Sequence, residues 1–388
     1  MKNVVVVGGR LQGLEALYLG SKAGMHTTLI DKDESPIGQN FCNRFIHHDV
    51  LQYDKVILGI LKEADFVLPA LENQEALAAL AHLRDTEGIN LIYDEYAYGI
   101  SSSKLRSDEA MAKLKMPVPC HHPQGKLPYI AKPSSMSGSE GVRKLNTQGE
   151  IAEFLKTHDR NDWVIQEYLG GPSYSIEIIG IPNDYSVYHI TELFMDKTYD
   201  CKRVMSCPDI SQGLKIQFQN LALALGNMVQ LHGIMDVEVI DDQGILKILE
   251  IDVRIPSQTP INIYHATGVN FMAELHRKFC PHSDYPIPEK LGKEKFVSLE
   301  QISVNNGEIV VLGEHLLAKA QDVSHKINFC GADEALTNYA KGKKEWVATM
   351  VCSAESAEAL AAKRQEMFRR IGALQGTKMK VLDFVPAI

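Results

Sequence analysis

Two short stretches, DVEVI at residues 236–240 and LEIDVR at residues 249–254, place carboxylates at alternate positions of otherwise apolar runs. The linking segment DDQG, residues 241–244, predicts a hairpin. Alternate residues of a strand share a face, so the carboxylates of each run point the same way. Carboxylates on so apolar a hairpin need cations, and their hard oxygen atoms suit Mg²⁺ that carries nucleotide phosphates. The Val, Ile and Leu residues between them favour a metal site over a solvated polar face.

A second motif lies upstream, where the strand pattern of residues 129–132 carries Lys132 directly into the Ser/Gly-rich loop PSSMSGSEG. Such a loop can close over phosphates with its backbone N–H groups and hydroxyls. Taken alone, a surface hairpin with an exposed lysine explains this segment equally well. Further along, WVIQEYLGG ends a strand pattern with Gln166 and Glu167. These residues could meet an adenine edge and the ribose hydroxyls, although a solvated edge strand is the better explanation of that motif by itself.

The N-terminal residues alternate between strand and helix patterns. A β-branched run at 4–7 ends in Gly8-Gly9, a helical pattern follows, and further strands are expected at 27–30, 45–47 and 66–68. The alternation predicts a parallel α/β unit over residues 1–95. In the turn GGRLQG, Arg10 stands where a dinucleotide site needs a glycine. We therefore expect an ordinary α/β turn, or one that contacts a different ligand, in preference to a nicotinamide site.

The later segments are more mixed. Residues 173–181 and 187–194 suit an antiparallel pair, and 220–231 and 354–371 suit helices. Short strands are expected at 309–312 and 347–352, and the Pro-rich stretch PHSDYPIPEKLG marks a boundary near residue 290.

The bulk properties narrow the function classes. A chain of 388 residues is long enough for two or three domains. Its formal charge of −9 disfavours nucleic acid as a general partner. Seven scattered cysteines without a C-x-x-C pair argue against a disulfide framework or a zinc site and favour a reducing cytoplasm. The apolar stretch near the N-terminus is too short for a signal peptide or a membrane span.

The order of these motifs along essentially the whole chain resembles the ATP-grasp superfamily. The overall likeness is to amide-forming members, the ligases of pyrrolysine biosynthesis that join 3-methyl-D-ornithine to the side-chain amine of L-lysine. The resemblance implies an α/β and α+β fold in three domains. These are a Rossmann-like pre-ATP-grasp domain (1–95), an ATP-grasp domain (96–290) with a lid at about 113–170, and a small C-terminal domain (291–388).

The resemblance also implies site residues and cofactors, namely ATP and Mg²⁺. The metal ligands would be Glu238, Glu250 and Asp252, although many members have Asn where Asp252 stands. Arg254 would stabilise the charge that develops near an acyl phosphate, and Lys202 would contact phosphate. The expected nucleotide contacts are Lys104, Lys132, Ser139, Gln166, Glu167, Tyr168 and Leu169.

The acceptor amine is expected at the N-terminal domain, because ligands bind beyond the carboxyl ends of parallel strands. Glu72, with Leu11 and Gln12, is predicted to hold L-lysine. Arg10, Asp31 and Asp49 could line the same edge or touch nucleotide. His232 could contact substrate, although a packed or solvated histidine is the more common case.

The implied reaction begins with a substrate carboxylate attacking the γ-phosphate of ATP. An amine then attacks the acyl phosphate, giving an amide, ADP and phosphate. The partners are therefore small-molecule amino acids, with no nucleic acid and no membrane, and the oligomeric state stays open. The alternatives are a carboxylating ATP-grasp enzyme that uses bicarbonate, a dehydrogenase that uses the N-terminal turn, and a non-catalytic nucleotide sensor.

Overall fold

The computed structural model describes residues 2–136, 138–206, 208–281, 283–285 and 294–387. The chain forms two compact units, each of which gathers distant segments. The first unit comprises Met1–Glu95, Lys202–Pro208 and Arg254–Phe384, and the second comprises Tyr96–Cys201, Asp209–Val253 and Val385–Ile388. The division into three domains at residues 95 and 290 stays a prediction, and the Pro-rich stretch at the second boundary lies mostly outside the described residues.

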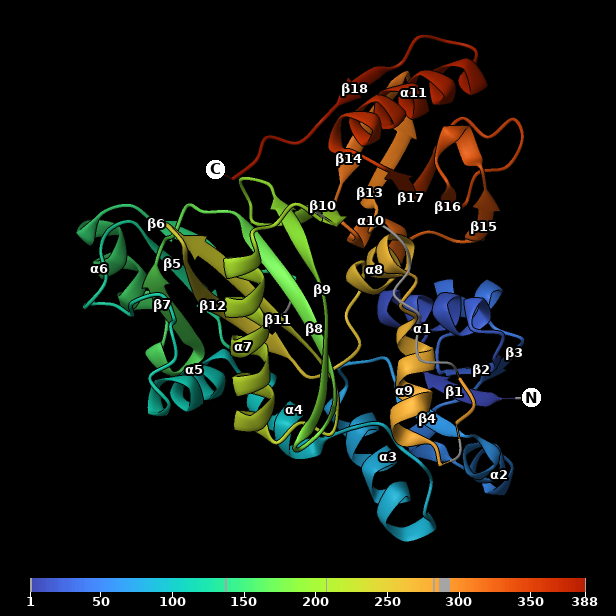
Figure 1. Ribbon diagram of the computed structural model, residues 1–388, viewed down its shortest axis with the longest axis horizontal. Coiled ribbons are helices and arrows are strands. Elements are labelled where there is room, and N and C mark those ends of the chain that lie inside the picture. Colours follow the sequence, from blue (N-terminus) through green and yellow to red (C-terminus); the bar gives the residue numbers. More distant parts are fainter. Residues whose placement is uncertain (1, 137, 207, 282, 286–293, 388) are drawn as a thin grey trace. The chain divides into compact units, whose positions relative to one another are not determined.

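The first unit begins with the expected parallel sheet, in the order β3-β2-β1-β4 (Figure 1). Its strands are β1 (Asn3–Val7), β2 (His26–Asp31), β3 (Arg44–His47) and β4 (Phe66–Pro69). Its helices are α1 (Leu11–Lys22), α2 (Lys55–Glu63) and α3 (Gln74–Glu87), with the short helices η1 (Ile37–Phe41) and η2 (Val50–Gln52). Buried aliphatic residues from the strands, α2 and α3 form one core. The parallel α/β prediction for this region is confirmed.

The glycines of the first turn serve close packing between strand and helix. A Cβ on Gly13 would lie 1.9 Å from the carbonyl oxygen of Gly8, so no larger residue fits there. Gly8 itself has a φ of +99°, which L side chains rarely adopt. Packing therefore accounts for both glycines without a bound pyrophosphate.

The rest of the first unit is a second sheet with helices. The strand order of this sheet is β10-β13-β17-β16-β15. In addition, β14 pairs with β13, and β18 pairs with β14. The strands are β10 (Cys201–Ser206), β13 (Phe296–Asn305), β14 (Glu308–Leu312), β15 (Ser324–Ile327), β16 (Glu334–Thr337), β17 (Trp346–Ala354) and β18 (Lys380–Leu382). The helices are α8 (Thr259–Thr267), α9 (Phe271–Phe279), α10 (His315–Ala318), α11 (Ala357–Gln375) and η4 (Phe329–Gly331).

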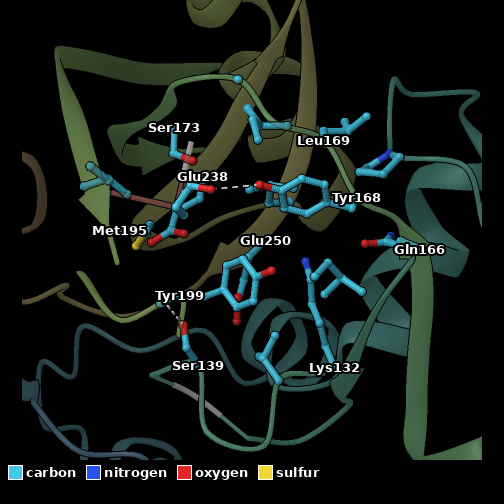
Figure 2. A pocket seen from close by; sticks show the side chains of 18 of the residues that line it. Lys132, Ser139, Gln166, Tyr168, Leu169, Ser173, Met195, Tyr199, Glu238 and Glu250 are labelled. Carbon is cyan, nitrogen blue, oxygen red and sulfur yellow. Dashed lines mark hydrogen bonds between the residues drawn. The ribbon is translucent and has the colours of Figure 1, made fainter. Parts of the chain in front are cut away.

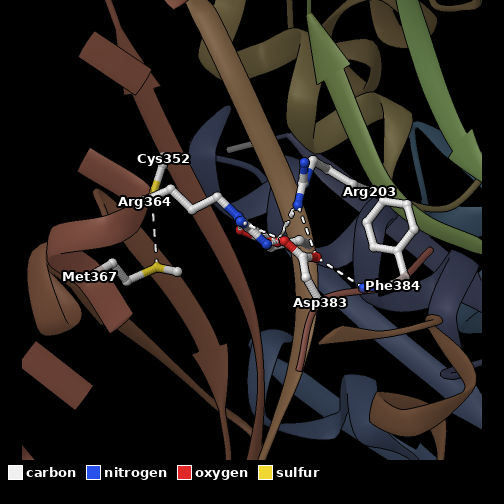
Figure 3. Close-up of polar contacts among 7 residues, drawn as sticks. Arg203, Cys352, Arg364, Met367, Asp383 and Phe384 are labelled. Carbon is white, nitrogen blue, oxygen red and sulfur yellow. Dashed lines mark hydrogen bonds and ion pairs between the residues drawn. The ribbon is translucent and has the colours of Figure 1, made fainter. Parts of the chain in front are cut away.

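A buried ion network connects three of these elements. Glu300 on β13 is 2% exposed and accepts hydrogen bonds from Nε and Nη2 of Arg364 of α11, at 2.7 and 2.8 Å. Arg203 of β10 lies 3.3 Å from the same carboxylate, and Asp383 pairs with both arginines (Figure 3). Burial lowers the pKa of Arg364, but Glu300 and Asp383 together outweigh burial, so the net shift is upward. Since a buried carboxylate is tolerated only with such partners, the network defines how β10, β13 and α11 pack.

The second unit contains two smaller sheets. One has the order β6-β5-β7, and the other contains the antiparallel neighbours β12-β11-β8-β9. Helix α7 crosses the latter and contacts β8, β9 and β12 (Figure 1). The strands are β5 (Tyr129–Pro133), β6 (Arg143–Leu145), β7 (Trp163–Glu167), β8 (Ser173–Ile181), β9 (Asp184–Met195), β11 (Gly233–Asp242) and β12 (Ile245–Asp252). The helices are α4 (Glu95–Ser101), α5 (Lys104–Lys113), α6 (Gln148–Thr157), α7 (Gln212–Val229) and η3 (Arg160–Asp162).

Several boundaries differ from the sequence expectation. Helix α7 begins at Gln212, eight residues before the expected start at 220, because Ser211 caps it by accepting from the N–H of Leu214. Helix α11 ends at Gln375 rather than 371. The antiparallel pair at 173–181 and 187–194 is confirmed in β8 and β9. Within the described residues, no helix combines the length and apolar character needed to cross a membrane.

Candidate active site

A cavity of about 470 Å³ opens in the second unit, a size typical of small-molecule sites (Figure 2). Its walls come from β5, β7, β8, β9, the β11–β12 hairpin and the start of α5. Among its lining residues are Lys104, Lys132, Ser139, Gln166, Glu167, Tyr168, Leu169, Glu238 and Glu250. The fold therefore brings together Lys104 and residues from three motifs that lie far apart in the sequence, namely the carboxylate hairpin, the loop after Lys132 and the segment WVIQEYLGG.

The carboxylate hairpin has the geometry expected from its alternation. Strands β11 and β12 pair antiparallel with Glu238 directly opposite Glu250 and Asp236 directly opposite Asp252. Cross-strand partners share a face, so these four carboxylates form one acidic surface. A register shift follows Glu238, where Leu249 is skipped. Glu238 and Glu250 line the cavity.

Lys104 neutralises part of this acidic surface. It is the first residue of α5, and its Nζ donates to Oε1 of Glu250 at 2.7 Å and to the carbonyl of Met136 at 2.8 Å. Burial lowers the pKa of Lys104, but Glu250, Asp252 and Glu238 together outweigh it, so the net shift is upward. Lys104 is thus a firmly charged ammonium in the lining of the cavity.

Lys132 reaches the cavity from β5, opposite Val164 of β7 (Figure 2). Burial lowers the pKa of Lys132, while Glu250 and Asp108 oppose the shift. In the loop that follows, Ser139 adopts a φ of 59° and its Oγ donates to the carbonyl of Tyr199 at 2.5 Å. The loop is thereby held against the segment after β9.

The Gln166–Leu169 segment forms one wall. Glu167 accepts the backbone N–H of Cys120 at 2.8 Å, which fixes its carboxylate. Tyr168 donates its hydroxyl to the carbonyl of Ala387 at 3.1 Å, and Nζ of Lys144 lies 3.4 Å from its ring centroid. Pro386 and Ala387 line the cavity as well. No sequence pattern predicts that these two residues contribute to this wall.

In the first unit, the predicted acceptor residues meet the predicted arginine. Oε1 of Glu72 accepts a hydrogen bond of 2.9 Å from Nε2 of Gln12. The same oxygen forms an ion pair with Nε of Arg254 at 2.8 Å. Leu11 precedes Gln12 at the start of α1. Gln12, Glu72 and Arg254 therefore lie together. They follow the ends of β1, β4 and β12, respectively.

The other predicted residues of the first unit have local partners. Arg10 pairs with Asp33 at 3.4 Å. Asp31 accepts from the N–H of Gly9 at 2.6 Å and from the N–H of Asp33 at 2.8 Å. Asp49 caps η2. Nucleotide or lysine contacts by these residues stay predictions.

Lys202 and His232 are also outside the cavity lining. Lys202 is buried on β10. Its neighbour Arg203 lies on the opposite face of that strand and donates a hydrogen bond to Glu300. His232 is exposed in the segment between α7 and β11. The structure therefore separates Lys202 from its basic neighbour, while the proposed roles of Lys202 and His232 stay predictions.

The donor set fits a magnesium ion that is bound largely through phosphates. Mg²⁺ usually takes one or two carboxylates plus substrate oxygens rather than an all-protein cage. Glu238 and Glu250 supply two hard-oxygen donors directly across from each other, with Asp252 next along β12. Among the described residues, no three His, Cys, Asp or Glu side chains form a metal site by themselves. Nucleotide phosphates would have to complete the coordination.

Comparisons with known proteins agree with this geometry. An ATP-grasp domain family matches residues 101–258, the part of the chain that builds most of the cavity. N5-carboxyaminoimidazole ribonucleotide synthetase, solved as an ADP complex, shares the fold with a TM-score of 0.70 at 14% identity, covering 96% of this chain and 98% of that one. The chain is an ATP-grasp enzyme, and the fold expected from the sequence is confirmed.

The curated relatives narrow the family. The 3-methyl-D-ornithine–L-lysine ligase of Methanosarcina acetivorans is 32% identical over 323 residues, 83% of this chain and 85% of that protein. The ligase of the same name from Methanosarcina barkeri is 33% identical over 325 residues, 83% and 85% of the two chains. The chain belongs to this family of ATP-dependent ligases.

Proposed function

We propose that this protein uses ATP to activate the carboxylate of 3-methyl-D-ornithine, or of D-ornithine, and joins it to the side-chain amine of L-lysine in pyrrolysine biosynthesis. One observation carries the proposal. A single cavity is lined by two lysines, a pair of facing carboxylates and the Gln166–Leu169 segment. The names of the relatives supply the substrates.

The lining residues have distinct roles in this reaction. Lys104 and Lys132 hold the phosphates and spread the negative charge as the substrate carboxylate attacks the γ-phosphorus and ADP leaves. The loop that carries Ser139 covers the phosphates and keeps water from the acyl phosphate. The acceptor amine then attacks the acyl carbon, loses a proton and expels phosphate, so no covalent bond to the enzyme is needed.

Glu238, Glu250 and Asp252 are the residues that would hold Mg²⁺, which supplies positive charge to the phosphate oxygens. Lys104 already pairs with Glu250. The same ammonium can therefore serve the carboxylate before nucleotide binds and the phosphates afterwards. Arg254 stabilises negative charge at the acyl phosphate, and Lys202 adds a further phosphate contact.

The acceptor site is proposed around Glu72, with Gln12 and Leu11. The carboxylate of Glu72 is oriented by Gln12 and Arg254, so it is presented to an ammonium in a fixed rotamer. Arg10, Asp31 and Asp49 remain candidates for the same edge or for nucleotide, and His232 for substrate. The free thiols of the described cysteines support a location in a reducing cytoplasm.

Replacing Glu72 with glutamine should raise the KM for L-lysine about tenfold, since a partly exposed charge-assisted contact is lost. The KM for ATP should change far less. Steady-state kinetics with each substrate varied in turn measures both values. Glu75→Gln, three residues further on and exposed, is the matched control. An unchanged lysine KM in Glu72→Gln would move the acceptor site elsewhere.

The reaction itself is tested by mass spectrometry of products formed from ATP and a panel of basic D- and L-amino acids. The expected product is an amide of the D-ornithine compound on the side-chain nitrogen of L-lysine, formed with one ADP and one phosphate. Phosphate release that requires labelled bicarbonate, with label in the product, would identify a carboxylating enzyme instead. ATP binding without phosphate release under any combination would indicate a sensor.

A further inference from the structure

A buried carboxylate that the reaction above does not use lies beside the cavity. Asp108 of α5 is 7% exposed, and its Oδ2 accepts a hydrogen bond of 3.1 Å from Nε2 of Gln166. Gln166 itself is 2% exposed. Nε2 of His121 lies 3.4 Å from the same oxygen of Asp108. The three side chains all belong to the second unit.

The carboxylate dictates which end of the Gln166 amide faces the cavity. An ionised carboxylate only accepts hydrogen bonds, whereas an amide has a donating NH₂ end and an accepting oxygen end. The reverse orientation would place two acceptor oxygens against each other. The NH₂ end must therefore face Asp108, which leaves Oε1 directed toward the interior of the cavity, as Figure 2 shows for Gln166.

We propose that Asp108 is a positioning residue that sets the purine preference of the nucleotide site, an inference that rests on the proposed function. By holding the NH₂ end of Gln166, it keeps an acceptor oxygen aimed at the base. The 6-amino group of adenine donates to that oxygen. A 6-oxopurine presents an acceptor in the same place and is rejected, because two acceptors then face each other without a proton between them.

The placement of Asp108 supports this role. Lys104 and Asp108 are four residues apart on α5, so they share one face of the helix. One helix face thus supplies both a phosphate-binding ammonium and the carboxylate that orients the base contact. Burial raises the pKa of Asp108 to about 6, with His121 and Lys132 opposing the shift. The carboxyl group is therefore ionised in assays at about pH 8.

The test compares ATP with ITP, which differs from it by having an oxygen at position 6. The wild-type protein should prefer ATP in kcat/KM. In Asp108→Asn, the asparagine can turn its own NH₂ to Gln166 and allow the glutamine amide to reverse. The ATP-to-ITP ratio of kcat/KM should then fall roughly tenfold, the size of one hydrogen bond gained and one lost. A merely structural role would lower both values together and leave the ratio unchanged.

Two further variants isolate the effect. Glu109→Gln changes an exposed neighbour on the same helix that pairs with Lys113, and its ratio should equal that of wild type. Gln166→Met removes the acceptor oxygen, and adding Asp108→Asn to it should change the ratio no further. If Asp108→Asn does not fold, Asp108→Ser in the same assay takes its place.

The outcomes separate this inference from the function on which it rests. An ATP-to-ITP ratio that stays at the wild-type value in a folded Asp108 variant overturns the role of Asp108. An additional loss of preference when Asp108→Asn is added to Gln166→Met overturns it as well, because the residue would then act by another route. A wild-type protein that binds no ATP would instead refute the proposed nucleotide site.

Discussion

Glu250→Gln is expected to reduce phosphate release about 1,000-fold, because it removes a charge from the proposed site for the metal and the phosphates. Glu250 faces Glu238 across the hairpin and accepts from Lys104. Glutamine keeps the shape of the side chain and relieves repulsion from Glu238 while it weakens the pair with Lys104. The free energy of unfolding should therefore change little, and only the chemistry should suffer.

A coupled assay of phosphate release, with thermal unfolding of the same preparation, measures both effects. Asp242→Asn is the matched control, because it lies on the same hairpin at the turn and does not line the cavity. Wild-type phosphate release by Glu250→Gln would refute the metal assignment. A collapse of the fold would show instead that the Lys104–Glu250 pair is structural.

Lys132→Ala should weaken ATP binding by about 1.5–3 kcal/mol, which corresponds to roughly a 10- to 150-fold higher Kd. The ammonium of Lys132 comes from the rigid strand β5 and points into the cavity. Burial disfavours its charged form, so a polyanionic ligand gains from restoring the charge. In the alanine variant, the phosphates of ATP lose the ammonium of Lys132 as a partner.

Isothermal titration calorimetry with ATP and magnesium measures this affinity. Lys156→Ala serves as the comparison, since Lys156 is an exposed lysine of α6 in the same unit and pairs with Glu153 at 2.8 Å. ATP affinity equal to wild type in Lys132→Ala would mean that Lys132 does not reach the phosphates.

Features that depend on local periodicity could be predicted from the sequence. The same-face carboxylates of the hairpin follow from strand alternation, and the register of β11 and β12 places Glu238 opposite Glu250. The parallel N-terminal sheet likewise follows from alternating strand and helix patterns. In these cases the information lies within a few residues of the feature.

Features that depend on contacts between distant segments could not be predicted. Strand β13 is buried along most of its length yet carries Glu300 and Gln301, so its polar residues obscured the pattern of a buried strand. Glu300 is tolerated only because Arg364 comes to it from α11. The four-residue spacing between Lys104 and Asp108 indicates that both lie on one face of a helix. The contact of Asp108 with Gln166 could not be predicted, because Gln166 is 58 positions away.

The contact between Ala387 and the cavity wall has a practical consequence for anyone who produces this protein. Ala387 donates its N–H to the carbonyl of Met195 at 3.0 Å, and its own carbonyl accepts from Tyr168. A foreign segment joined directly after Ala387 would therefore begin beside the cavity and would compete with or displace these contacts. Purification handles for all the assays above therefore belong away from Ala387, and a preparation with a tag joined there and low ATP affinity should be remeasured after the tag has been cleaved.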